Sequence, residues 1–270
     1  MTHELVFLSG LPRSGSTILT SLLNQHPSIL ATTTSPVLGM ILNFYNHWEP
    51  QTVAQLADKN EQQRTDMVGA MLRAAHKHFN KPVIVDKNRG WPRDIKLVTE
   101  LLDKKPKIIC TVRSIPEVLA SFVTLANKNP GDTFIDKQLK ESGFAINNTN
   151  RCRLLWNSGT VGESWRALLS GYQYDKSCLL LLEYNDIVEN PVQVMKKIEQ
   201  FLFIDAHEYD INNLQPMNEK DEFHGINGLH DIRPVVKKTS LPPEKIIGHE
   251  LTEYYSSMKL DFWNTNKETT

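Results

Sequence analysis

The chain carries four short, almost continuously apolar runs, at residues 5–9, 82–86, 107–112 and 178–184. Strands without polar alternation are buried on both faces, which is typical of a parallel sheet covered by helices on each side. Segments with apolar residues at helical spacing separate and follow these runs, at 14–25, 61–79, 93–102, from Ser114, 153–169, from Asn190 and 242–256. The sequence therefore predicts a three-layer α/β/α fold with a central, mainly parallel sheet.

Two stretches between these elements lack a regular pattern. Residues 127–150 are polar and rich in turn formers, which predicts a surface excursion or lid, and residues 205–240 are only weakly periodic. The chain has no internal repeat and no low-complexity segment, and its 270 residues fit one large domain. We therefore expect a single domain over residues 1–270.

The composition argues against several classes of partner. Lys and Arg number 30 against 31 for Asp and Glu, so no basic excess attracts nucleic acid or an anionic membrane. No apolar run reaches the roughly 18 residues of a membrane span, and residues 1–9 lack the pattern of a signal peptide. Cys110, Cys152 and Cys178 form neither a disulfide framework nor a metal pattern. These features lead us to expect a cytoplasmic protein.

The first apolar run leads into a polar loop, residues 9–17, that precedes a predicted helix. The first N–H groups of a helix have no partner within the helix, and together with the helix dipole they attract anions. Arg13 and the hydroxyls of Ser14, Ser16 and Thr17 add further hydrogen-bond donors. This segment is therefore a candidate site for a phosphate or sulfate group.

The loop nearly matches the nucleotide-binding pattern G-x-x-x-x-G-K-[ST]. Gly10, Gly15 and Thr17 are in register, but Ser16 stands at the lysine position and the cation has moved to Arg13. That departure counts against an ATP or GTP site.

A second candidate anion site follows the third apolar run. Arg113 stands where that run ends, next to the start of a predicted helix, where an arginine is well placed for a phosphate. Ser114 and Glu117 have the spacing of a capping box at this helix start. Ser121 lies two turns into the helix.

The segment FLSGLPRSGSTILTSLLNQHP resembles the 5′-phosphosulfate loop of sulfotransferases that use 3′-phosphoadenosine 5′-phosphosulfate (PAPS). It is closest to the arginine-bearing version of the tyrosylprotein and carbohydrate sulfotransferases. The resemblance implies a P-loop NTPase-like sulfotransferase fold. It also implies that five consecutive residues hold the phosphosulfate: Arg13, Ser14, Gly15, Ser16 and Thr17. Arg113 and Ser121 match the family's pair that holds the 3′-phosphate, which ATP lacks.

Two further segments resemble the family more loosely. The segment CLLLLEYNDIVENPVQVMKKIEQFL is similar to the strand and helix that follow the nucleotide site, which implies that Tyr184 touches the nucleotide. The segment HDIRPVVKKTSLPPEKI resembles the family's closing loop, and there Lys238 or its neighbour Lys237 would cover the 3′-phosphate.

Lys87 is the candidate catalytic residue. It directly follows the second apolar run, and if the first two strands are parallel it emerges at the same sheet edge as the phosphosulfate loop. There a cation stabilises the negative charge that grows on the leaving group during in-line displacement. Lys87 also matches the catalytic lysine of the family, and we assign Arg13 a catalytic role beside it. Phosphosulfate carries less charge than a triphosphate, so we expect no metal requirement.

The base that activates the acceptor is left open. Tyrosylprotein sulfotransferases carry a Glu soon after the His-Pro pair, and the matching position here is a Thr. Four residues remain candidates on their chemistry alone: His47, Glu49, Asp86 and His230. An acceptor with an acidic hydroxyl, or an amine, needs little help from a base. The aromatic residues within 36–50 fit an acceptor pocket or core packing equally well.

The sequence thus predicts a sulfotransferase that moves a sulfuryl group from PAPS to a hydroxyl or amine acceptor. A first alternative is a P-loop kinase, in which Asp86 at the end of VIVD would bind Mg²⁺. A second is a catalytically silent nucleotide-binding protein. A kinase needs ATP and Mg²⁺, a sulfotransferase needs PAPS, and a silent protein binds nucleotide without turnover.

Overall fold

The computed structural model describes residues 3–49, 60–216, 225–231, 234–236 and 241–264. Its centre is a five-stranded sheet whose strands are β1 (Glu4–Gly10), β2 (Ile29–Thr34), β3 (Val83–Lys87), β4 (Ile108–Val112) and β5 (Leu179–Glu183). The strand order is β2-β3-β1-β4-β5, and every neighbouring pair is parallel. The parallel sheet predicted from the apolar runs is confirmed.

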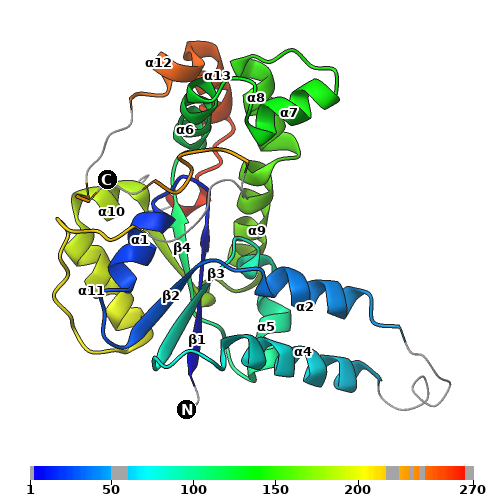
Figure 1. Ribbon diagram of the computed structural model, residues 1–270, viewed down its shortest axis with the longest axis vertical. Coiled ribbons are helices and arrows are strands. Elements are labelled where there is room, and N and C mark those ends of the chain that lie inside the picture. The colour runs from blue at the N-terminus through cyan, green and yellow to red at the C-terminus, as the bar shows by residue number, and fades with distance from the viewer. Residues whose placement is uncertain (1–2, 50–59, 217–224, 232–233, 237–240, 265–270) are drawn as a thin grey trace.

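Helices cover both faces of this sheet (Figure 1). One face packs against α1 (Ser16–Leu23), α10 (Tyr184–Glu189) and α11 (Pro191–Leu202). The other packs against α2 (Val37–Asn46), α4 (Asn60–His76), α5 (Ile95–Leu102), α9 (Thr160–Asp175) and the 3₁₀ helix η1 (Trp91–Asp94). Alternate residues of each central strand enter opposite cores, because successive side chains in a strand point to opposite faces. The predicted three-layer arrangement is therefore confirmed.

A third apolar core lies beyond the carboxyl ends of the strands, at the top of Figure 1. It is built from α6 (Ile115–Lys128), α7 (Phe134–Glu141), α8 (Asn148–Asn157), α12 (Glu244–Ile247) and α13 (His249–Ser257). Two short 3₁₀ helices, η2 (Lys176–Cys178) and η4 (Phe262–Asn264), complete the described elements.

Residues 127–150, predicted as a surface excursion or lid, contain α7 and the start of α8, and their role as a lid stays a prediction. Several of their polar side chains form buried hydrogen bonds or cap the two helices. Arg151 donates to both carboxylate oxygens of Asp136, at 2.7 and 2.8 Å, and Asp136 is fully buried. Thr133 and Asn147 cap the two helices by accepting from main-chain N–H groups.

Three features of the fold differ from what the sequence predicts. Strand β2 was not predicted, because it is an edge strand with alternating burial rather than a continuous apolar run. The helix predicted over 153–169 is two helices, α8 and α9, which meet at Gly159. A Cβ on that glycine would lie 2.8 Å from the Leu155 Cα. Ser114 stands at the N-cap of α6, but its hydroxyl faces the Glu117 carboxylate at 3.4 Å, so the capping box is not formed.

The structure also describes the three cysteines and the lengths of the helices. All three cysteine thiols are free and buried, and burial raises the pKa of the Cys110 thiol. Within the described ranges, no helix combines the length and apolarity needed to cross a membrane.

Candidate functional site

The predicted site residues gather at the carboxyl edge of the sheet. Strand register pairs Leu8 of β1 with Lys87 of β3, and Gly10 of β1 with Thr111 of β4. The loop that follows β1 therefore lies between the ends of β3 and β4. Lys87 emerges at the same edge as this loop, which is the arrangement predicted from the sequence.

The loop between β1 and α1 turns through three residues with positive φ, namely Gly10 (120°), Arg13 (59°) and Gly15 (93°). Gly10 is required by close approach, because a Cβ there would lie 2.1 Å from the Thr111 carbonyl oxygen. Helix α1 begins at Ser16, two residues later than predicted, and its first main-chain bond runs from the Leu19 nitrogen to the Gly15 oxygen at 3.0 Å. The N–H groups before that bond converge at the loop and can receive an anion.

The hydroxyls of the loop do not share one role. Ser14 is fully buried, and its Oγ donates to the Leu11 carbonyl and lies 2.6 Å from the Thr111 hydroxyl. Its side chain thus fastens the loop to β4, and the group that it can offer a ligand is its main-chain N–H. Ser16 and Thr17 are half-buried at the start of α1.

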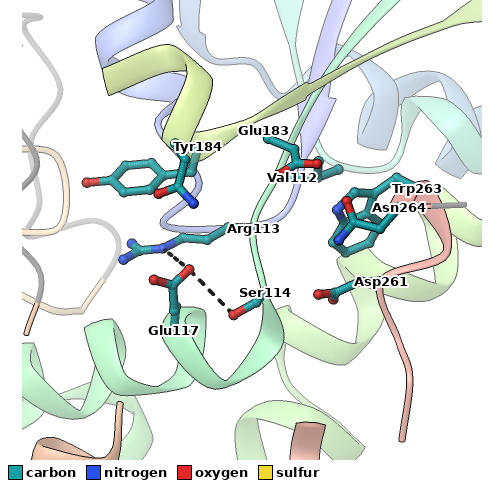
Figure 2. Close-up of a pocket in the computed structure, with 10 residues that line it drawn as sticks. Val112, Arg113, Ser114, Glu117, Glu183, Tyr184, Asp261, Trp263 and Asn264 are labelled. Carbon is teal, nitrogen blue, oxygen red and sulfur yellow. Dashed lines mark hydrogen bonds and ion pairs between the residues drawn. The ribbon is translucent and has the colours of Figure 1, made fainter. Parts of the chain in front are cut away.

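Arg113, predicted as the second anchor, is 6% exposed at the end of β4. Its Nη1 donates to the Arg13 carbonyl at 3.0 Å, and its guanidinium lies over the Tyr184 ring, 4.0 Å from the ring centre. Figure 2 shows the side chain between Tyr184 and Glu117, whose carboxylate lies 3.5 Å from the arginine Nε. The remaining nitrogen, Nη2, is buried and has no hydrogen-bond partner among the described residues. An unpaired buried guanidinium nitrogen is costly, and an incoming phosphate oxygen would satisfy it.

The side chain of Arg13 leaves its own loop and joins this second anchor. Its Nε donates to the Ser121 hydroxyl of α6 at 3.1 Å, and its Nη1 donates to the Leu229 carbonyl. The structure therefore brings Arg13, Arg113 and Ser121 into one cluster. Tyr184, the first residue of α10, joins them because its ring lies against the Arg113 guanidinium. The same ring borders the loop, since a Cβ on Gly15 would lie 3.3 Å from it.

Lys87 is buried at the end of β3, with 9% of its surface exposed. Val83 and Val85 of the same strand enter the core beneath α1, whereas Ile84 enters the core beneath α4. Because alternate residues share a face, Lys87 lies on the α1 face of the sheet, beside the loop. The Lys87 N–H donates to the Thr32 hydroxyl at 3.0 Å.

Asp86 does not fit the Mg²⁺ role of the kinase alternative, nor that of a base. It is 1% exposed, and its carboxylate accepts hydrogen bonds from His76, Ser35 and Trp91. A carboxylate enclosed by three protein donors has no open face for a metal or an acceptor.

The other candidate bases are spread over the molecule. His47 and Glu49 follow the far end of α2, about 15 Å of helix from the end that adjoins Lys87. His230 follows Leu229, so it lies next to the contact made by Arg13. The aromatic residues of α2 pack against the α4 face, where Tyr45 accepts from Arg64. Lys237 and Lys238 lie outside the described residues.

The structure adds a cavity of about 170 Å³ that the sequence analysis did not predict. It lies beside Arg113, between the ends of β4 and β5 and the carboxyl-terminal segment (Figure 2). Glu183 from β5 meets Asp261, Trp263 and Asn264 there. No local pattern marks these residues, because they meet only when the carboxyl-terminal segment returns to the sheet edge.

Comparison with known proteins places these features in context. Residues 6–208 match the model of the sulfotransferase family. Protein-tyrosine sulfotransferase A of Caenorhabditis elegans is 22% identical over 266 residues, which cover 91% of this chain and 64% of that protein. The protein-tyrosine sulfotransferase of Drosophila melanogaster is 23% identical over 207 residues, covering 73% of this chain and 38% of that protein. The chain thus spans less than two thirds of the length of these relatives.

Two solved structures share the fold. The sulfotransferase domain from the curacin biosynthetic pathway superposes with a TM-score of 0.57 at 16% identity, covering 96% of this chain and 98% of that one. Sulfotransferase STF9 from Mycobacterium avium superposes with a TM-score of 0.53 at 14% identity, covering 97% and 77%. The predicted α/β architecture is the one that these structures have.

Proposed function

The chain belongs to the sulfotransferase family, and from this premise we propose that it transfers a sulfuryl group from PAPS to a hydroxyl or amine acceptor. The observation that supports the proposal most is the buried Nη2 of Arg113, which no described residue pairs and which lies close to Arg13 and Ser121. PAPS carries anionic groups on both the 3′ and the 5′ position of its ribose. The chain offers two anion sites at one edge of the sheet. A kinase substrate such as ATP has no 3′-phosphate to occupy the second site.

Each predicted ligand takes a defined part in this proposal. The main-chain N–H groups of residues 14–17 and the hydroxyls of Ser16 and Thr17 hold the 5′-phosphosulfate, with Gly15 allowing close approach. Arg113 and Ser121 hold the 3′-phosphate, and the Tyr184 ring supports the Arg113 guanidinium. Lys238 covers the 3′-phosphate.

Arg13 and Lys87 stabilise charge at the reacting end. When bound, PAPS supplies the sulfuryl group: its bond to the 5′-phosphate oxygen breaks as a bond to the acceptor forms in line. Lys87 meets the negative charge left on that oxygen from the α1 face of β3. The Arg13 guanidinium reaches the same oxygen by rotating away from Ser121. The acceptor proton passes to solvent or to a base, for which His230 is the candidate beside the site.

The acceptor class follows from the missing glutamate and from the relatives. The two relatives named above are protein-tyrosine sulfotransferases, which favours a phenolic hydroxyl. A Thr stands where tyrosylprotein sulfotransferases carry a Glu, which favours an acceptor acidic enough to ionise with little help. We expect turnover to rise as the pKa of a substituted phenol falls. A single domain over 1–270, a cytoplasmic location and a reaction without metal remain predictions.

A thermal-shift titration with 3′-phosphoadenosine 5′-phosphate (PAP) tests the proposal, run against ATP with Mg²⁺ and with EDTA. A ligand at 100 times its Kd stabilises a fold by about 2.7 kcal/mol, which is a readable shift. We expect PAP to stabilise the protein in the presence of EDTA, and PAPS with substituted phenols to release PAP. A shift with ATP and Mg²⁺ alone would overturn the proposal in favour of a kinase. A PAP shift without turnover on phenols or amines would favour a silent nucleotide-binding protein.

A further inference from the structure

A buried polar network lies beneath Lys87, on the opposite face of the sheet. The Asp86 carboxylate accepts from His76 Nε2 at 2.8 Å, from Ser35 Oγ at 2.6 Å and from Trp91 Nε1 at 2.9 Å. All four side chains are at least 95% buried. The three donors come from α4, from the link between β2 and α2, and from η1. One carboxylate thus ties together three elements that surround the end of β3.

The partners of the two His76 nitrogens bear on its protonation. Nδ1 lies 2.9 Å from the Leu72 carbonyl, which can only accept, so Nδ1 carries a hydrogen. Nε2 faces the Asp86 carboxyl group at 2.8 Å, so a second hydrogen on Nε2 gives a cationic imidazole paired with a buried carboxylate.

The pKa of His76 agrees with this assignment. Burial lowers it, but the hydrogen bonds to Asp86 and Leu72 and the charge of Asp86 together raise the pKa above its ordinary value of 6.5. Within the part of the chain that the structure describes, Asp86 is the one charged group that acts on the imidazole. The Phe79 ring, 6.2 Å away between ring centres, is its aromatic neighbour.

The network is coupled to Lys87 through the main chain. Asp86 and Lys87 are adjacent in β3, so they point to opposite faces, and the rotation of one determines the direction of the other. Ser35 holds both residues: its Oγ donates to the Asp86 carboxylate, and its N–H donates to the Lys87 carbonyl at 2.8 Å.

From this geometry we propose that His76 and Asp86 are positioning residues, which hold the end of β3 so that Lys87 points at the phosphosulfate loop. The proposal rests on the role proposed for Lys87 above. It assigns these two residues no contact with substrate, and it needs the imidazole in its charged form. Loss of that proton leaves the buried Asp86 charge unbalanced, which loosens the end of the strand.

Three variants separate positioning from general stability. His76→Leu removes both imidazole donors and leaves Asp86 one partner short. His76→Gln keeps a neutral N–H donor for Asp86 but cannot titrate. His78→Leu is the matched control, because His78 lies two residues further along the chain and is exposed. For each variant we would measure kcat against pH, the Kd for PAP, and hydrogen exchange at the Lys87 amide.

We expect His76→Leu to lower kcat by about 10- to 100-fold per folded molecule, as small misplacements of catalytic groups do. Its PAP affinity stays unchanged, because Arg113 and Ser121 lie on other elements. His76→Gln leaves the Asp86 charge unbalanced at every pH, so we expect it to have the low kcat that the wild type reaches only as His76 deprotonates, without that pH dependence. A kcat and a pH profile that match the His78→Leu control would overturn the proposal.

Two readouts do not depend on activity. We expect ¹⁵N imidazole spectra to show that both His76 nitrogens stay protonated to a higher pH than those of the exposed His78 in the same protein. We also expect faster exchange of the Lys87 amide in His76→Leu. If the wild type transfers no sulfuryl group but these two results hold, the proposed function fails and the positioning role stands. A His76 that titrates at or below the pH of His78, or normal turnover of His76→Leu with unchanged exchange, overturns the positioning role alone. If His76→Leu does not fold, the His76→Gln profile and the imidazole spectrum decide.

Discussion

Replacing Arg113 by Ala tests the assignment of the 3′-phosphate site most directly. In the structure Arg113 has one nitrogen on the Arg13 carbonyl, one at 3.5 Å from Glu117 and one without a partner in the part of the chain that the structure describes. A phosphate that engages the unpaired Nη2 and shares a neighbouring nitrogen gains two charge-assisted hydrogen bonds. Bonds to charged groups are worth about 1.5–3 kcal/mol each. Two such bonds sum to about 3–6 kcal/mol, so we expect Arg113→Ala to weaken PAP binding by at least about 3 kcal/mol, or roughly 100-fold in Kd.

The same substitution has little effect on adenosine 5′-phosphate, which lacks the 3′-phosphate and uses the loop after β1. Isothermal titration calorimetry with both nucleotides measures the two losses on the same variant. Arg93→Ala is the matched control, because Arg93 is an exposed arginine of η1. Arg113→Lys is the second variant, because it keeps the positive charge but lacks the paired N–H donors of a guanidinium. Equal losses for PAP and adenosine 5′-phosphate in Arg113→Ala would refute the assignment.

Three further predictions address the catalytic lysine and two buried ion pairs. Lys87→Ala should remove about 2–4 kcal/mol of transition-state stabilisation and so lower kcat, while the Kd for PAP stays unchanged. Rapid-quench turnover that matches the wild type would contradict this prediction. Because the pKa of His76 is raised in the folded protein, its contribution to the free energy of unfolding is fully present below pH 6.5. This contribution is lost as the pH rises through the folded-state pKa, so the urea midpoint should fall over that rise in pH. Asp136→Asn should cost about 3–5 kcal/mol, because it breaks the buried pair with Arg151, whereas Asp132→Asn at an exposed pair should cost under about 1 kcal/mol. Burial raises the pKa of Asp136, but the hydrogen bonds from Arg151 and Gly131 outweigh burial and lower it. The stability that the pair contributes is therefore present above the ordinary pKa of an Asp and is lost in acid. Equal urea stabilities of the two Asn variants would contradict the role of the pair.

Local patterns in the sequence predicted the parts of the molecule that depend on near neighbours. Continuous apolar runs identified β1, β3, β4 and β5, because a strand covered on both faces has no polar alternation. The glycines and hydroxyls around the end of β1 predicted an anion loop, and the positive φ of Gly15 belongs to this turn itself. The edge position of Lys87 followed from parallel pairing alone.

Edge strands and helix breaks were harder to predict, because packing rather than pattern determines them. Strand β2 alternates in burial and pairs with β3 alone, so its sequence carries no continuous apolar signal. The break between α8 and α9 depends on how closely Gly159 and Gly162 approach the preceding helix, where a Cβ on Gly162 would lie 1.7 Å from the Trp156 carbonyl oxygen. The periodicity of 153–169 continues through that break.

The sequence by itself determined which chemical groups stand at the carboxyl edge of the sheet, and only the tertiary structure decided which of them touch. Arg13 and Ser121 are 108 positions apart, and no spacing rule says that the Arg13 guanidinium turns away from its own loop to reach that hydroxyl. Asp86 was predicted as a possible metal ligand or base, yet Ser35, His76 and Trp91 from three separate elements enclose it. The physical reason is that a strand or a turn forms from interactions within a few residues, whereas the direction and partners of a buried side chain depend on every element packed around it.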